Sequence, residues 1–110
     1  MAEKIYNKLV RDKIPQVIAG SNATPITRTL SDDEFVKELK LKLIEEAKEL
    51  VAAESREDKV AELADIVEVT KKIMRVEGVT WDESEVVRIQ KLADRGGFED
   101  KIFLEKVIEN

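Results

Sequence analysis

The sequence contains no cysteine and no histidine. Without cysteine, the chain can form neither a disulfide nor a thiolate metal site. Without histidine, it lacks the imidazole of a Ser-His-Asp triad, of a histidine-ligated zinc site and of a di-iron bundle built on Glu-x-x-His pairs. The chemistry that stays open to the chain depends on its carboxylates, and Asp and Glu together number 24.

Aromatic residues are scarce, and long apolar runs and an excess of positive charge are missing. Aromatics make up 5% of the chain, so we expect an aliphatic core. No stretch approaches the roughly 18 apolar residues of a membrane helix, and the first residues lack the apolar region of a signal peptide. We therefore expect a cytoplasmic protein without a membrane partner. The net charge of −5 argues against a nucleic-acid polymer as a partner.

Capping sequences mark three helix starts in a chain whose 110 residues suit a single domain, 1–110. Ser31, Ser55 and Thr80 each precede a helix-forming stretch and are followed three residues later by an acid. Gly78 follows the second stretch and is a suitable left-handed stop. The predicted helices cover about residues 32–54, 56–77 and 81–95. Because the connection between the first two is short, we expect them to be antiparallel neighbours.

The ends of the chain suggest smaller elements. Pro15 suits the first position of a short helix through residues 16–19. The segments 24–30 and 101–108 contain β-branched and apolar residues, and we expect them to form a small two-stranded β ribbon packed on a helix. The predicted fold is therefore mainly α. Since three helices leave apolar surface uncovered, we expect a second copy to complete a helical bundle by dimerisation.

Two acid pairs lie on the two helices of the predicted hairpin. Glu46 and Glu49 form the first pair, Glu62 and Asp65 form the second, and both have i, i+3 spacing. At roughly 100° per residue, Glu46 and Glu62 each fall inside an apolar stripe, and the second acid of each pair lies at its edge. The pairs lie at similar distances from the turn, so we expect them to face one another.

The acid pairs have two interpretations. An unpaired carboxylate on a core-facing stripe is costly to desolvate, and a bound divalent cation would remove that cost. Four oxygen ligands without histidine or cysteine suit Mg²⁺, with Mn²⁺ as the second choice. In a chain with 39% charged residues, however, such pairs also arise by chance. The acids then form a solvated face or internal ion pairs with lysines.

The spacing of the acids resembles a known metal motif. Glu45, Glu46 and Glu49 read EExxE, and after twelve residues Glu62 and Asp65 read ExxD. This pattern is similar to that of the all-α nucleoside triphosphate pyrophosphatases, the superfamily of MazG, dimeric dUTPases and phosphoribosyl-ATP pyrophosphohydrolase. The opening YNKLVRDKIP, the later RGGF and the IFL that follows it resemble the small MazG-like branch, so the resemblance covers nearly the whole chain.

The resemblance implies an activity and a set of site residues. Members hydrolyse a nucleoside triphosphate between the α and β phosphates, with Mg²⁺, and are dimers or tetramers whose active sites lie in the bundle. The implied metal ligands are Glu46, Glu49, Glu62 and Asp65. Glu45 is implied as a helper in catalysis or is a solvated acid.

Basic residues would contact the substrate phosphates if this resemblance holds. Lys8 and Arg11 lie in the first segment, and Arg95 precedes a Gly-Gly turn whose backbone N–H groups can approach an anion. The alternative is that all three are solvated and balance an acidic chain. For Arg88 and Lys91 the solvated interpretation is favoured.

The substrate has more than one candidate. A noncanonical nucleoside triphosphate, removed in a house-cleaning reaction, is the first interpretation. Phosphoribosyl-ATP in histidine biosynthesis is the second. A third interpretation, from a different class, is a non-catalytic helical interaction module whose acids form a structural ion-pair network.

Overall fold

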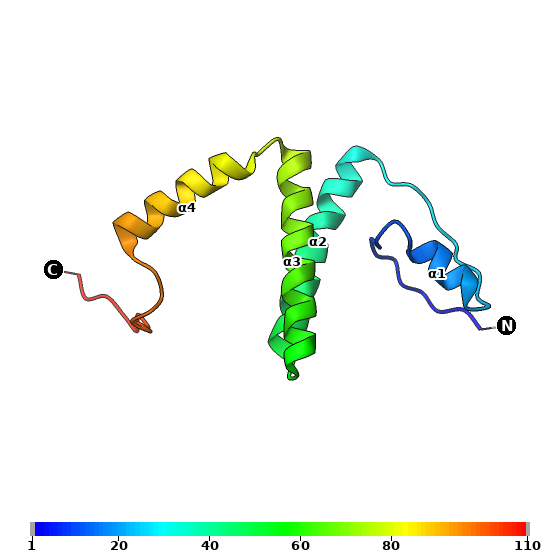
Figure 1. The fold of residues 1–110 in the computed structure, drawn as a ribbon, viewed down its shortest axis with the longest axis horizontal. Helices are drawn as coiled ribbons and strands as arrows, with labels where there is room; N and C mark the ends of the chain where they lie inside the picture. Colours follow the sequence, from blue (N-terminus) through cyan, green and yellow to red (C-terminus); the bar gives the residue numbers. More distant parts are fainter. Residues whose placement is uncertain (1, 110) are drawn as a thin grey trace. The chain divides into compact units, whose positions relative to one another are not determined.

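The computed structural model describes residues 2–109 and divides the chain into two compact units, Met1–Gly78 and Val79–Asn110. The described residues form four helices and no strand. The first unit contains α1 (Ile14–Gly20), α2 (Asp32–Ala52) and α3 (Arg56–Glu77), and the second contains α4 (Trp81–Arg95) (Figure 1). The prediction of a mainly helical chain is confirmed.

The predicted caps begin α2, α3 and α4. The side chains of Ser31, Ser55 and Thr80 accept hydrogen bonds from the backbone N–H three residues on. At Ser31 and Thr80 the glutamate at that third position also accepts from the cap residue, which completes a capping box. Gly78 ends α3 with φ 72°, a left-handed conformation that costs glycine little. Local hydrogen bonding therefore fixes where these helices begin and end.

Helices α2 and α3 pack as an antiparallel pair and contain the core of the first unit (Figure 1). They have 21 and 22 residues and are joined by residues 53–55 only. Leu39 from α2 and Val69 from α3 are the buried apolar residues of the described chain. Half-buried aliphatic and aromatic residues extend this seam along both helices: Phe35, Leu43, Leu50, Ile66 and Ile73. The apolar stripes predicted from the sequence are therefore the faces that meet.

The predicted β ribbon is wrong. Residues 24–30 and 101–108 adopt no regular secondary structure. Pro25 offers no backbone N–H to a partner strand, and Lys101 has a positive φ of 58°, which is incompatible with an extended strand at that point. A two-stranded ribbon is marginal in water even with a suitable sequence, so these local features are enough to prevent it.

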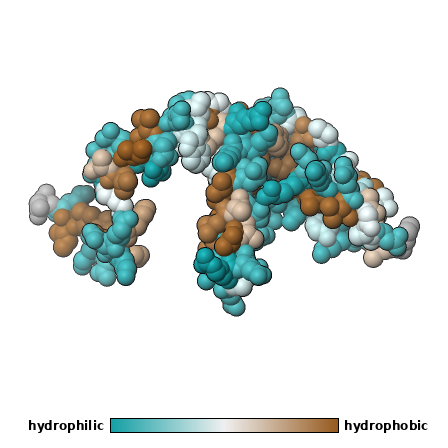
Figure 2. All heavy atoms as spheres, viewed as in Figure 1, coloured by the Kyte–Doolittle hydropathy of each residue, from teal (hydrophilic) through white to brown (hydrophobic). Residues whose placement is uncertain are grey.

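The α2–α3 pair carries a second apolar stripe that stays exposed. On α2 it consists of Leu41, Ile44 and Val51, and on α3 of Val60, Leu63 and Val67, all at helical spacing and between 48% and 88% exposed. Apolar side chains accordingly appear at the surface of the hairpin beside hydrophilic ones (Figure 2). Within the described part of the chain, no helix combines the length and hydropathy needed to cross a membrane.

Candidate metal centre

The acid pairs come together because the hairpin is symmetric about its turn. Glu46 lies seven residues before residue 53, and Glu62 lies seven residues after residue 55. Antiparallel helices joined by residues 53–55 therefore bring the two glutamates to the same level. Glu46, Glu62 and Asp65 each have a carboxylate oxygen within 4.8 Å of the others. Glu45, Glu46 and Glu49 form a second such group, so Glu46 is common to both.

Glu46 is the centre of this cluster and is nearly inaccessible to water. Only 4% of its surface is exposed, although it is an acid in a helix rich in charged residues. Its Oε2 atom is buried and has no hydrogen-bond partner, and the same is true of Oε2 of Glu62 on the facing helix. Buried polar atoms are normally satisfied, so two orphaned carboxylate oxygens within one cluster are the kind of donor set that suits a positively charged ligand.

The surroundings of Glu46 oppose its ionisation. The pKa of Glu46 is raised to about 7, first by burial, then by the adjacent carboxyl group of Glu62 and by the charges of Glu49 and Asp65, against the opposing charge of Lys42. The pKa of Glu49 is also raised, first by burial and then by Glu62. These two raised pKa values indicate that the nearby basic side chains do not neutralise all of the negative charge around Glu46 and Glu49.

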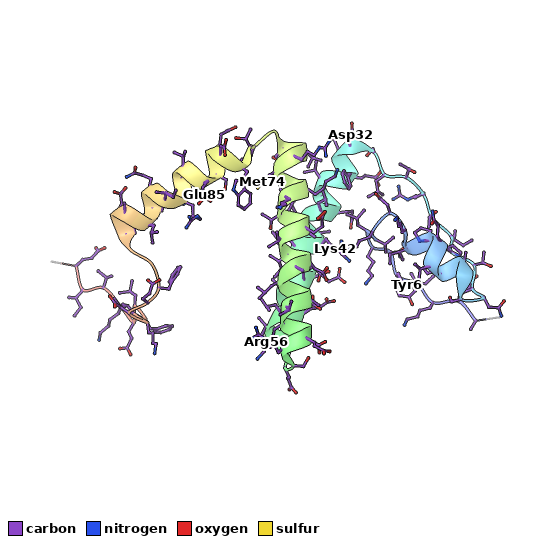
Figure 3. The ribbon with its side chains drawn as sticks, viewed as in Figure 1. Tyr6, Asp32, Lys42, Arg56, Met74 and Glu85 are labelled. Carbon is purple, nitrogen blue, oxygen red and sulfur yellow. The ribbon has the colours of Figure 1, made fainter. Side chains whose placement is uncertain are left out.

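Two lysines partly compensate the acids on α2. Lys42, labelled in Figure 3, places its Nζ 3.6 Å from an oxygen of Glu45 and 3.6 Å from one of Glu46. Lys8 donates a hydrogen bond of 3.2 Å to Oε1 of Glu45. Burial opposes ionisation of Glu45, but the hydrogen bond from Lys8 and the charges of both lysines outweigh it and lower the pKa of Glu45. Glu45 is thus held ionised, whereas Glu46 is not.

Arg11 compensates the acid pair on α3. Its Nη2 atom lies 2.6 Å from Oδ1 of Asp65, and the two residues are 54 positions apart in sequence. The guanidinium is 59% exposed and the carboxylate is 35% exposed, so solvent reaches this ion pair. The segment before α1 therefore contributes one basic side chain to each acid-bearing helix, Lys8 to α2 and Arg11 to α3.

The residues present fit a hard divalent cation. Carboxylate oxygens are the preferred protein ligands of Mg²⁺ and Mn²⁺, and Glu46, Glu62 and Asp65 bring three of them together, while Glu49 lies in the second group with Glu45 and Glu46. The two orphaned oxygens lie on opposite helices, and their residues, Glu46 and Glu62, belong to the same group of carboxylates. The raised pKa of Glu46 follows first from its burial and then from the carboxylates around it, and both causes favour a positive charge at this point.

The structure brings the predicted acids together in two groups that share Glu46, and it places two of the predicted phosphate ligands, Lys8 and Arg11, beside them. Lys8 and Arg11 contact the acids themselves. Arg95 is the last residue of α4, in the second unit. Sequence reasoning missed the contacts of Lys42, although a lysine three and four positions before two glutamates is a spacing at which helical side chains meet. Glu45, grouped with the solvent-side acids by its position, is half-buried.

Comparison with known proteins gives a family match and one relative. The family model described as phosphoribosyl-ATP pyrophosphohydrolase matches residues 11–89, which include all five acids. An uncharacterized protein of Mycolicibacterium smegmatis is 54% identical over 50 residues, which cover 46% of this chain and 51% of that protein. The chain thus spans about half the length of this relative. The comparison with solved structures found no match.

Proposed function

The chain belongs to the phosphoribosyl-ATP pyrophosphohydrolase family, and from this premise we propose that it hydrolyses a nucleoside triphosphate to a monophosphate and pyrophosphate. The observation that supports this most is the convergence of Glu46 and Glu62, each with an orphaned buried oxygen, inside the region matched by the family. Hydrolysis of a phosphoanhydride needs charge neutralisation and an aligned water rather than a covalent nucleophile. A centre of carboxylates without histidine is adequate for that task.

The ligands in this proposal are Glu46, Glu49, Glu62 and Asp65. When bound, Mg²⁺ would neutralise phosphate charge and lower the pKa of the attacking water. The side chains have separate tasks: Glu46 and Glu62 hold the buried side of the site, and exposed Glu49 and half-buried Asp65 lie nearer the solvent. Glu45, held ionised by its lysines, is proposed as a helper that keeps Lys42 directed at the site.

Phosphate contacts are proposed for Lys8, Arg11 and Arg95. Lys8 and Arg11 are already within ion-pair distance of Glu45 and Asp65, so a substrate bound through the cation would present its phosphates near them. Arg95 lies in the second unit and beyond the matched residues 11–89, so its role is proposed from the resemblance of the RGGF motif alone. We also propose a single domain, 1–110, because the family match continues past Gly78.

We propose that the enzyme is a homodimer or homotetramer. The support comes from the exposed stripes of α2 and α3, where Val51 is 88% exposed and Ile44 and Leu63 are about half exposed. Only Leu39 and Val69 are buried apolar residues in the described chain, which is a small core. A second hairpin packed on these stripes would complete a four-helix bundle with more apolar burial.

The substrate proposed first is a noncanonical nucleoside triphosphate. The description of the matching family favours phosphoribosyl-ATP, which is the second candidate, and both are cleaved at the same phosphoanhydride bond. The two candidates share the triphosphate and differ at the base, which in phosphoribosyl-ATP carries a phosphoribosyl group. The acid cluster is therefore evidence for cleavage of this bond but does not distinguish the two substrates, which a direct assay can do.

A panel assay tests this proposal. The protein is incubated with Mg²⁺ and with canonical triphosphates, noncanonical triphosphates and phosphoribosyl-ATP, and the products are separated by chromatography. Formation of a monophosphate and pyrophosphate supports the proposal and identifies the preferred base. Release of orthophosphate and a diphosphate would place cleavage at the wrong bond. No product from any nucleotide, with circular dichroism showing a folded chain, would overturn the proposal and favour a non-catalytic helical module.

A further inference from the structure

The segment before α1 has one docked part, residues 8–11. Lys8 and Arg11 stand at its ends, and Leu9 and Val10 between them are half-buried, whereas Ile5 and Tyr6 are 73% and 59% exposed. Figure 3 shows Tyr6 in this segment, on the side of the hairpin that carries Lys42. Lys8 and Arg11 hold this segment against the acid cluster, and we call residues 8–11 the strap.

The strap bridges the two acid-bearing helices. Lys8 Nζ lies 3.2 Å from Glu45 on α2, and Arg11 Nη2 lies 2.6 Å from Asp65 on α3. No other segment contributes a basic side chain to both helices at this cluster among the ion pairs of the described residues. The strap therefore supplies positive charge at the rim, while the oxygen of Glu46 at the centre keeps no partner.

Arg11 and a cation would compete for the same carboxylate. Asp65 belongs with Glu46 and Glu62 to the group whose oxygens lie within 4.8 Å of one another, and Arg11 contacts Asp65 directly. A divalent cation bound to this group would repel a guanidinium on the same carboxylate. Because Arg11 is 59% exposed, its departure leaves no buried charge behind, and an exposed ion pair is weak enough to be displaced.

We propose that the strap is an internal counter-ion that exchanges with the divalent cation: metal binding at the acid cluster releases Arg11 from Asp65 and loosens residues 8–11. This inference rests on the metal centre of the proposed function. It adds an order of binding: the cation first displaces Arg11 from Asp65, and only then can Arg11 contact an anionic phosphate. Most of the strap, including Lys8, lies before the residues matched by the family.

The first test measures binding of Mn²⁺ alone, without nucleotide, by calorimetry. Removing the competing charge in Arg11→Gln should tighten Mn²⁺ binding about two- to five-fold, the range expected for an exposed ion pair. Lys13→Gln removes the same charge from an exposed side chain two residues away and should bind as the wild type does. Arg11→Lys, which keeps the charge, should also stay close to the wild type.

The second test measures release of the strap directly. Trypsin cleaves after Lys8 and Arg11, and cleavage after exposed Lys106 serves as an internal reference. Saturating Mg²⁺ should accelerate cleavage at the strap relative to the reference in the wild type and have no such effect in Glu46→Gln. An unchanged or slower cleavage ratio in the wild type overturns the proposal.

The outcomes separate the strap from the metal centre. If Mn²⁺ binds the wild type and Arg11→Gln with equal affinity, the strap proposal fails and the metal centre survives. If Mn²⁺ binds neither protein, both proposals fail. If the metal binds but no nucleotide is hydrolysed, the exchange stands and the proposed reaction does not.

Discussion

Glu46 and Glu62 face each other across the α2–α3 hairpin, and each buries one carboxylate oxygen that has no hydrogen-bond partner. The two residues lie at equal distances from the connection, so the relationship follows from the hairpin itself. Unlike the acids at the rim, which have Lys8, Lys42 and Arg11 as neighbours, these two oxygens have no basic partner in the described chain. A bound metal ion would therefore stabilise the hairpin most at Glu46 and Glu62.

The raised pKa of Glu46 predicts that stability depends on pH in the metal-free protein. Its folded pKa is about 7, above the ordinary 4.5, so between these values the folded state binds the extra proton. The free energy of unfolding should therefore fall as pH rises from 4.5 to 7, on the order of 3 kcal/mol in total. The raised pKa of Glu49 acts in the same direction.

Urea unfolding with EDTA at several pH values measures this dependence. Glu46→Gln should remove most of the slope between pH 5 and 7, and Glu68→Gln, an exposed acid of α3, should keep it. Glu34, whose pKa is lowered to about 2, affects stability only at more acidic pH. A wild-type protein whose stability is level or rises between pH 5 and 7 would contradict the crowded-carboxylate account.

Substitution of Arg95 tests the phosphate contact that is proposed for this residue. Loss of a charge-assisted contact to phosphate in Arg95→Gln should raise KM for the best nucleotide about ten-fold or more. Lys91→Gln removes a charge from the same helix and should leave KM near that of the wild type. Equal KM values for all three proteins would remove Arg95 from the site.

The exposed apolar stripes predict self-association. Leu63→Glu introduces a charge into the stripe of α3 and should shift the sedimentation coefficient from that of an oligomer to that of a monomer. Val17→Glu, at an exposed apolar residue on α1, is the control and should sediment as the wild type does. A wild-type chain that sediments as a monomer at micromolar concentration would contradict the proposed bundle.

Features decided by neighbouring residues were predictable from the sequence. Ser31 and Thr80 form their caps within one helical turn, and Gly78 needs only its own backbone freedom to end α3. The acid cluster was also predictable, because helical spacing and a short connection together determine which side chains face each other. Each of these features depends on contacts that are close in sequence.

Contacts between residues far apart in the sequence could not be predicted from local sequence patterns. Lys8 meets Glu45 across 37 positions and Arg11 meets Asp65 across 54, and no local pattern encodes those partners. The β ribbon failed for a different reason, because Pro25 and the positive φ of Lys101 oppose strand pairing and a two-stranded ribbon is marginal even in a suitable sequence. The charge pattern suggested phosphate ligands at Lys8 and Arg11, but it could not show that the protein's own acids would bind them first.

The most direct test of the account compares pyrophosphate release by wild type, Glu62→Gln and Glu68→Gln, with Mg²⁺ and the best nucleotide of the panel. Both variants remove one acid from α3, but only Glu62 has an orphaned buried oxygen. We predict that Glu62→Gln loses at least about 100-fold in rate while Glu68→Gln stays near the wild type. Activity in Glu62→Gln that is close to that of the wild type would contradict the assignment of the metal centre.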